Sequence, residues 1–243
     1  AVSLHAQRNI VDADANGAVQ KVDIKSGNVS LKAGGYIGTA ANVIELSVGN
    51  LASASGANGV FLSETNGLTI GNLSNVTVNR VAASGASAAT EVANSAQTGL
   101  VASNGSVVIS NGVTHAGGMI INSDITLNGT GNLLLNSVNT ASKPGMALNA
   151  DISVAQGSIT LMSQAEITQS TDSQISAGGT IDVVSVRESI TMAQGASFTT
   201  TSNGDIRLSA NENLAIGLVD AGAGSVSLVS VTGSILDGYD AQV

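Results

Sequence analysis

A short phrase recurs along the chain: a glycine, any residue, an aliphatic residue, a usually polar residue and a second aliphatic residue. It reads GNVSL at 27, GSVVI at 105, GNLLL at 131, GSITL at 157, GTIDV at 179, GDIRL at 204 and GSVSL at 224. From position 105 onward these start positions follow one another at a nearly constant interval. A repeat of roughly 20–26 residues is typical of a solenoid in which each repeat forms one coil.

Shorter apolar–polar alternations lie between these phrases. Ile159, Ile167, Ile175 and Ile181 each lie in such a run and follow one another at short, similar steps. This alternation is the period of a strand with one buried face. Three short strands per repeat fit one coil of a parallel β-helix. The sequence therefore predicts an all-β fold, with residues 1–243 forming one parallel β-helical segment of about ten coils.

The composition suits a narrow aliphatic interior. Hydrophobic residues make up 43% of the chain, but aromatic residues only 2%. Antiparallel sandwiches are the alternative fold, because seven Asn-Gly pairs are hairpin signals. Sandwich cores usually have longer strands and more aromatic residues, so the β-helix is favoured. We expect the recurring glycines at coil corners, where a positive φ is common.

Residues 82–104, AASGASAATEVANSAQTGLVASN, interrupt the rhythm. The Ala/Ser-rich composition predicts a loop or short helix projecting from the rod. Insertions in solenoids map to loops that often carry binding surfaces, so a glycan- or protein-binding role is one alternative for this insertion. The other alternative is a solvent-exposed loop that binds no ligand.

The two ends of the chain resemble each other. RNIVDADANGA begins at Arg8 and GSILDGYDAQV at Gly233, which aligns Ile10 with Ile235. This match predicts that the chain is about one unit of a tandem array with a period near 225. Neighbouring units of the same polypeptide would then be its partners.

Several stretches resemble the repeat regions of giant bacterial surface exoproteins of the filamentous-haemagglutinin-like class. They are GGYIGTAANVIELSVGNLAS (34–53), GVFLSETNGLTIG (59–71), VTVNRVAASG (76–85) and GSVSLVSVTGSILDG (224–238). The resemblance implies a long β-helical rod, secreted or held at the bacterial cell surface, that serves adhesion, aggregation or biofilm formation. The NPNG-type phrase of the family's secretion domain is absent, so the chain looks like part of a shaft.

The charge pattern argues against several partners. The net charge is −9, and only eight Lys and Arg residues are present, so no basic stripe is available for nucleic acid or an anionic membrane. No uninterrupted apolar run is long enough to insert into a bilayer. Residues 1–10 lack a signal-peptide pattern. The absence of cysteine excludes disulfides and thiolate metal sites.

One segment has the spacing of a calcium loop. IVDADANGAVQKVD runs from Ile10 to Asp23. Its candidate ligands are the side chains of Asp12, Asp14, Asn16 and Asp23 and the carbonyl of Ala18. The last position of the loop is Asp rather than the usual Glu, and the aligned C-terminal copy, LDGYDAQ, lacks an acid in place of Asp14. A polar turn without metal is therefore the competing interpretation, and calcium is the one cofactor considered.

A polysaccharide-active enzyme is the remaining alternative, since many sugar-cleaving enzymes are β-helices. Their chemistry requires acids that are clustered or paired with a basic residue, whereas the acids of this chain are scattered between Asp124 and Glu212. We therefore expect no catalytic residue and a non-enzymatic structural role.

Overall fold

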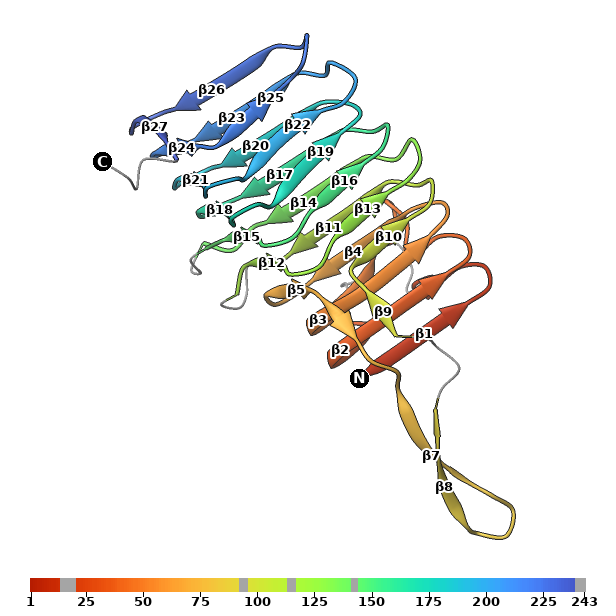
Figure 1. The fold of residues 1–243 in the computed structure, drawn as a ribbon. Coiled ribbons are helices and arrows are strands. Elements are labelled where there is room, and N and C mark those ends of the chain that lie inside the picture. The colour runs from red at the N-terminus through yellow and green to blue at the C-terminus, as the bar shows by residue number, and fades with distance from the viewer. Residues whose placement is uncertain (14–20, 92–95, 113–116, 141–143, 239–243) are drawn as a thin grey trace.

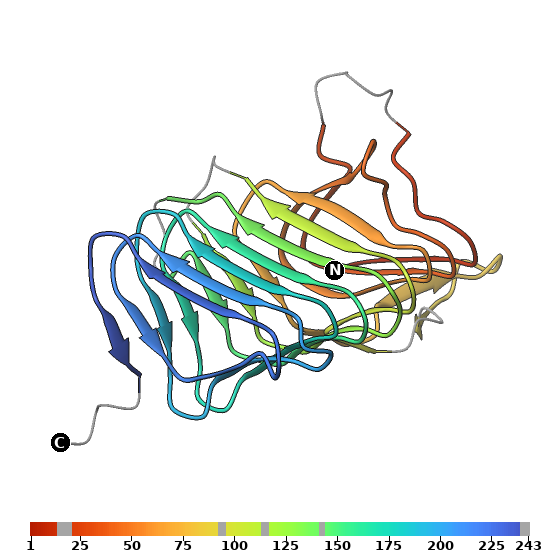
Figure 2. The same cartoon turned by 90° about the horizontal axis from the view of Figure 1, so that it is seen from above.

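The computed structural model describes residues 1–13, 21–91, 96–112, 117–140 and 144–238. These residues form an all-β parallel solenoid of about 9 turns without a helix. The turns follow one another along a single axis, from the N-terminal coil to the C-terminal coil (Figures 1 and 2). The predicted fold class is confirmed, with about nine turns in place of about ten.

Three ladders of parallel strands run along the rod. The first ladder contains β1 (Val2–Ala6), β2 (Ile24–Ala33), β3 (Ile44–Gly56), β10 (Leu100–Ala102), β13 (Ile125–Leu127), β16 (Ile152–Val154), β19 (Gln174–Ala177), β22 (Ser197–Thr200) and β25 (Leu218–Asp220). The second contains β4 (Val60–Glu64), β11 (Val107–Asn111), β14 (Leu133–Ser137), β17 (Ile159–Ser163), β20 (Ile181–Ser185), β23 (Ile206–Ala210) and β26 (Val226–Ser230). The third contains β5 (Leu68–Ile70), β12 (Met119–Ile121), β15 (Met146–Leu148), β18 (Ile167–Gln169), β21 (Ile190–Met192), β24 (Leu214–Ile216) and β27 (Ile235–Asp237).

The N-terminal turns are less regular than the later ones. The second ladder continues toward the N-terminus through the isolated bridges Ile10–Ile37 and Ile37–Val60. The long strand β3 pairs with β2, β4, β5 and β10. Successive parts of β3 therefore belong to different ladders, and the chain passes from one ladder to the next without a corner. The register of β2 against β3 shifts between Ser30 and Leu31, which marks a bulge.

The core consists of stacked aliphatic columns, one or two for each ladder. Ile159, Ile167, Ile175 and Ile181 lie on the second, third, first and again second ladders, and each is at most 1% exposed. Three strands per coil are therefore confirmed. Phe198 is fully buried and takes the place that Ile175 occupies one coil earlier, so the interior does accommodate one ring.

Six of the seven recurring glycines, all but Gly27, lie at the corner between the first and second ladders. A Cβ on Gly157 would lie 2.0 Å from the carbonyl oxygen of Gly131, and one on Gly204 would lie 2.1 Å from that of Gly179. None of these glycines has a positive φ. The expectation of positive φ is therefore wrong for the glycines of the phrase, where close stacking of successive backbones is the reason for the glycine. It is confirmed at other glycines, among them Gly99, Gly117 and Gly195.

One of the seven phrases belongs to a different ladder. GNVSL at 27 lies in β2, where Val29 pairs with Val2 and Leu51, and Leu51 in turn pairs with Ile70 of the third ladder. The other six phrases lead into strands of the second ladder. The phrase is therefore a signal for a corner followed by a strand rather than for one fixed place in the coil.

Several Asn-Gly pairs lie at corners of the solenoid rather than in hairpins. Asn104 and Asn203 precede second-ladder strands, and their side-chain oxygens accept hydrogen bonds from the backbone N–H groups of Thr130 and Ala223 in the following coil. Among the described residues, antiparallel pairing is confined to β6 (Asn72–Leu73) with β9 (Gln97–Thr98) and β7 (Thr77–Val81) with β8 (Ser87–Glu91).

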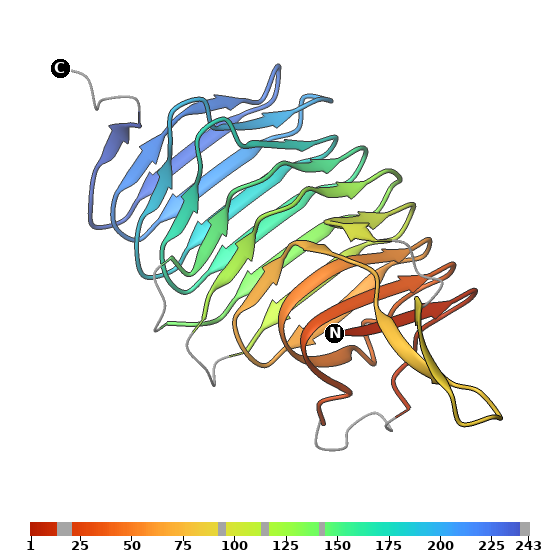
Figure 3. The same cartoon turned by 60° about the horizontal axis from the view of Figure 1, so that its bottom comes forward.

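These four strands form a ribbon that projects from the rod, and we call residues 72–98 the ribbon. It leaves the N-terminal half of the rod and extends past the first coil (Figures 1 and 3). The insertion predicted at 82–104 is therefore displaced: it begins earlier, ends before β10, and is an antiparallel ribbon rather than a loop or helix. Residues 92–95 lie outside the described residues.

The two ends of the chain that match in sequence lie at different places in the coil. Ile10 pairs with Ile37 on the second ladder, whereas Ile235 pairs with Leu214 on the third. The period near 225 remains a prediction, and its two matched segments are not equivalent positions of the solenoid.

Candidate functional site

Three carboxylates meet at the N-terminal turns. One oxygen each from Asp12, Asp23 and Glu45 lies within 4.8 Å of the others. Asp12 and Asp23 belong to the first turn, and Glu45 lies on β3 in the next. The backbone N–H of Glu45 donates to Asp23 Oδ2 at 2.9 Å, and that of Asp23 donates to the Glu45 carbonyl at 2.9 Å. We call these three residues the acidic cluster.

Glu45 is the most buried member of the cluster. It is 5% exposed, and its Oε1 atom is buried without a hydrogen-bond partner. Burial raises the pKa of Glu45 to about 7, and the hydrogen bond and negative charge of Asp23 and the charge of Asp12 contribute to the same increase. A buried carboxylate oxygen without a donor is costly unless a proton or a cation is present.

The acidic cluster contains part of the predicted calcium loop. Asp12 and Asp23 are brought together as predicted, while Asp14, Asn16 and Ala18 lie outside the described residues. Glu45 was not predicted, because the alternation in IELSV places Ile44, Leu46 and Val48 inward and Glu45 on the outer face. Nothing in the sequence around Glu45 indicates that its side chain is buried, because the residues that cover it are distant in the chain.

A second buried acid, Glu64, has a structural role. Its carboxylate oxygens accept hydrogen bonds from the backbone N–H groups of Val48 at 3.1 Å and Asn66 at 2.9 Å. Burial raises its pKa, and the backbone hydrogen bonds oppose the increase. In the following coils the same column of the second ladder holds Asn111, Ser137, Ser163 and Ser185.

This polar column ties the corner between the second and third ladders. Ser137 Oγ donates to the Gly145 carbonyl at 2.7 Å, and Ser185 Oγ donates to the Ala165 carbonyl at 3.0 Å. Buried polar groups with such partners stabilise a corner that has no regular strand pairing. The column therefore has a structural role at this corner.

The scattered acids of the later coils also serve the backbone. Asp124 Oδ1 accepts from the Asp151 N–H at 3.2 Å, and Asp151 Oδ1 accepts from the Gln174 N–H at 2.8 Å. Asp182 forms a two-point ion pair with Arg207 of the next coil, with both contacts at 2.8 Å. The Arg207 and Asp182 side chains are 54% and 34% exposed, so the pair adds little to stability.

The hollows of the described surface are shallow. A groove of about 620 Å³ is bordered by Lys25 and has Gly27, Gly49, Gly67 and Gly117 along it, and a second of about 630 Å³ lies over Phe61, Val108 and Leu134. Neither is lined by an acidic residue. A smaller groove of about 260 Å³ is lined by two carboxylates, Asp182 and Asp205, and by Arg207. Both carboxylates have partners: Asp182 pairs with Arg207, and Asp205 Oδ1 accepts from the Ser225 N–H at 2.7 Å.

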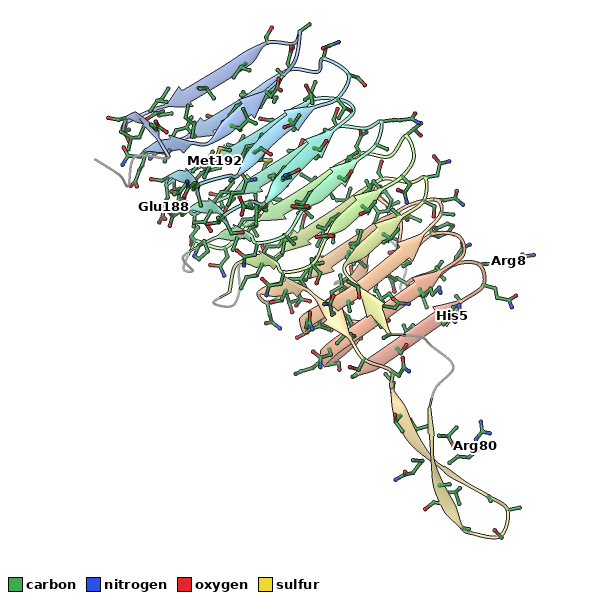
Figure 4. The ribbon with its side chains drawn as sticks, in the orientation of Figure 1. His5, Arg8, Arg80, Glu188 and Met192 are labelled. Carbon is green, nitrogen blue, oxygen red and sulfur yellow. The ribbon has the colours of Figure 1, made fainter. Side chains whose placement is uncertain are left out.

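The ribbon is the most exposed part of the described chain. Val78 and Val81 are 49% and 67% exposed. Arg80 extends from it at a distance from the rod, and Glu188 and Met192 lie on the opposite half of the molecule (Figure 4). Strands β7 and β8 pair with each other, and each has one edge without a partner strand among the described residues.

These features define a parallel β-solenoid with one projecting ribbon and one acidic cluster, in which Glu45 is buried, Asp12 half-buried and Asp23 exposed. No family model, curated protein or solved structure matches this sequence. Within the described part of the chain, no helix is long and apolar enough to cross a membrane.

Proposed function

We propose that this chain is a non-enzymatic rod segment of a large bacterial surface protein or secreted adhesin. It extends the parent polypeptide and displays adhesive regions in cell adhesion, aggregation or biofilm formation. Its partners are then neighbouring repeat units of the same polypeptide, and its location is extracellular or at the cell surface. Nucleic acid and membrane lipid are not among the proposed partners, because the chain has a net charge of −9.

The observation that carries this proposal is the continuity of the ladders. Each ladder passes strand by strand through the rod, with one strand per turn hydrogen-bonded to the next. Most columns beneath the ladders are aliphatic, and they are buried except at the last turn. Such a body resists bending because bending breaks hydrogen bonds and core contacts together. Outside the acidic cluster, Asp124 and Asp151 accept hydrogen bonds from the backbone, and Asp182 pairs with Arg207. These contacts support a structural role for the three acids.

A second candidate function rests on the ribbon. An exposed antiparallel ribbon with apolar residues and a cation at its surface could recognise a glycan or a protein at the cell surface or in the matrix. The exposure of Val78 and Val81 favours this candidate. A polysaccharide-active enzyme is the third candidate. The two larger grooves contain no acid, and the two acids of the smallest groove are bound to Arg207 and to a backbone N–H, which argues against this candidate.

The solenoid itself supplies a variant that separates these functions. Gly71 and Gly99 occupy the corner positions that Asn122 and Asp124 occupy one coil later. The N–H of Gly71 donates to the Leu51 carbonyl, just as that of Asn122 donates to the Ile70 carbonyl. The N–H of Leu100, which follows Gly99, donates to the Asp124 carbonyl. The ribbon therefore stands where the next coil has Ser123 alone. Replacing residues 72–98 by one serine gives a ribbon-less variant with a corner that the protein already uses.

The test applies the parent chain and the ribbon-less variant to a broad glycan array and to whole cells, with and without calcium. We expect neither protein to bind, as befits a spacer. Specific binding that disappears with the ribbon would replace the proposal by the second candidate. Release of reducing sugar from a polysaccharide panel would establish an enzyme and overturn the non-enzymatic role.

A further inference from the structure

We propose that Asp12, Asp23 and Glu45 bind one calcium ion that joins the first two turns of the solenoid. The inference does not depend on the proposed adhesin role, because it concerns the local chemistry of the acidic cluster. It also differs from the loop expected from the sequence, since the third carboxylate comes from β3 and not from the segment between Asp12 and Asp23.

The number and kind of oxygens suit a large hard cation. The three ligand atoms lie within 4.8 Å of one another, close enough to reach a single ion. Calcium takes about six to eight oxygens in flexible geometry and is commonly held by several carboxylates. Magnesium keeps most of its water and is usually bound by only one or two carboxylates. The three carboxylates could therefore surround a calcium ion without large movement of the backbone, with water completing its shell.

The burial of Glu45 is an independent sign of a ligand. The residue is only 5% exposed, and Oε1 has no hydrogen-bond partner. The neighbouring groups in the cluster are two more carboxylates, which can only accept when ionised. A cation satisfies the unpaired oxygen and removes the repulsion among the three negative charges.

The hydrogen bonds around the cluster hold it between two turns. Asn42 Nδ2 donates to the Asp12 carbonyl at 3.3 Å, and Asp23 and Glu45 exchange two backbone-based hydrogen bonds. An ion bound here would add a further link between the first turn and β3. These turns also hold the isolated bridges Ile10–Ile37 and Ile37–Val60, where strand pairing is weakest.

Calorimetric titration of the full chain with CaCl₂, after treatment with EDTA, tests the site directly. We expect one calcium ion per chain, with binding by Glu45→Gln and by Asp23→Asn weaker by at least about tenfold, because ligand charge sets calcium affinity. Asp220→Asn is the matched control. It removes one charge at the other end of the rod, where Asp220 accepts from the Gly222 N–H, and binding should not change.

Thermal unfolding supplies a second readout that does not confuse lost binding with lost folding. In EDTA, Glu45→Gln should melt at least as high as the parent chain, since it removes one of three repelling charges. Calcium should raise the midpoint of the parent and of Asp220→Asn, but not that of Glu45→Gln. Absence of calcium binding by the parent, or equal binding by all four proteins, would overturn the proposal.

Discussion

At the scale of single residues, the recurring glycine is required by the backbone of the preceding coil. Gly131, Gly157 and Gly204 each approach a carbonyl oxygen so closely that a Cβ would lie 2.0–2.1 Å from it. The obstacle is backbone within a continuous ladder, so it cannot move aside as a flexible side chain can. The phrase that revealed the repeat therefore reflects contact between coils.

This explanation predicts the effect of adding one methyl group. Gly157→Ala should lower the free energy of unfolding by about 1–3 kcal/mol, the usual range for overpacking. Gly27→Ala is the matched control, because a Cβ there meets nothing within 4 Å and Gly27 has no positive φ. It should be neutral or slightly stabilising. Urea unfolding followed by circular dichroism measures both, and equal effects of the two substitutions would refute the stacking argument.

Residue-level prediction from the sequence succeeded where partners are local and failed where they are distant. Asp12 and Asp23 could be recognised as neighbours because they flank one short segment. Glu45 and Glu64 could not, because alternation along a strand says which face a residue occupies but not what covers that face. The acids beside Glu45 come from another turn, and so does the N–H of Val48, one of the two N–H groups that bind Glu64.

At the scale of elements, the ribbon is an addition to a complete coil. Its base strands β6 and β9 stand at the corner between β5 and β10, and both flanking strands keep their pairing in the third and first ladders. All described residues of β7 are exposed. The base strands β6 and β9 lie against β3, but the projecting strands β7 and β8 are almost wholly exposed, and a two-stranded hairpin of this kind contributes little to the stability of the body that carries it.

We therefore predict that the ribbon-less variant folds as the parent does. Its thermal midpoint should lie within a few degrees of the parent value, because the core columns and ladders are unchanged. Circular dichroism during heating measures this, and it also verifies the variant used to test binding. Aggregation of the variant, or a midpoint lower by more than about 10 °C, would show that the ribbon supports the rod.

The bounds of the ribbon were predicted wrongly because its strands alternate with the same two-residue period as the strands of the coils. VTVNRV alternates like the strands of the solenoid, so residues 77–81 could not be separated from the rod. The Ala/Ser-rich tip was visible as an interruption, but Ala and Ser do not identify a strand. Strand direction is a long-range property, and no local pattern showed that β7 and β8 pair with each other.

At the scale of the whole molecule, three-strand coils could be predicted from spacing, whereas the behaviour of the ends depends on the complete stack. Val226 follows Ile181 and Ile206 in the same column, yet it is 44% exposed while they are each 1% exposed. Ile235 is similarly 48% exposed on the last strand of the third ladder. These residues face the position that a further coil would occupy.

The last turn also presents unused backbone donors. The N–H of Ile206 donates to Ser225 of the following coil, and that of Leu214 donates to Ser234. The equivalent N–H groups of Val226 and Ile235 therefore point away from the stack. An open edge with apolar residues is prone to pair with another chain. Because the two ends of the rod differ, such pairing is head to tail and does not close on itself.

We predict that the isolated chain associates end to end as its concentration rises. Sedimentation velocity should show a series of species longer than the monomer, and Val226→Lys combined with Ile235→Lys should suppress them, because two desolvated cations would face each new contact. Val186→Lys is the matched control: Val186 is 41% exposed, but it lies after β20, away from the last turn. A parent chain that stays monomeric at high concentration, or an equal loss of association in the control, would contradict pairing through the last turn.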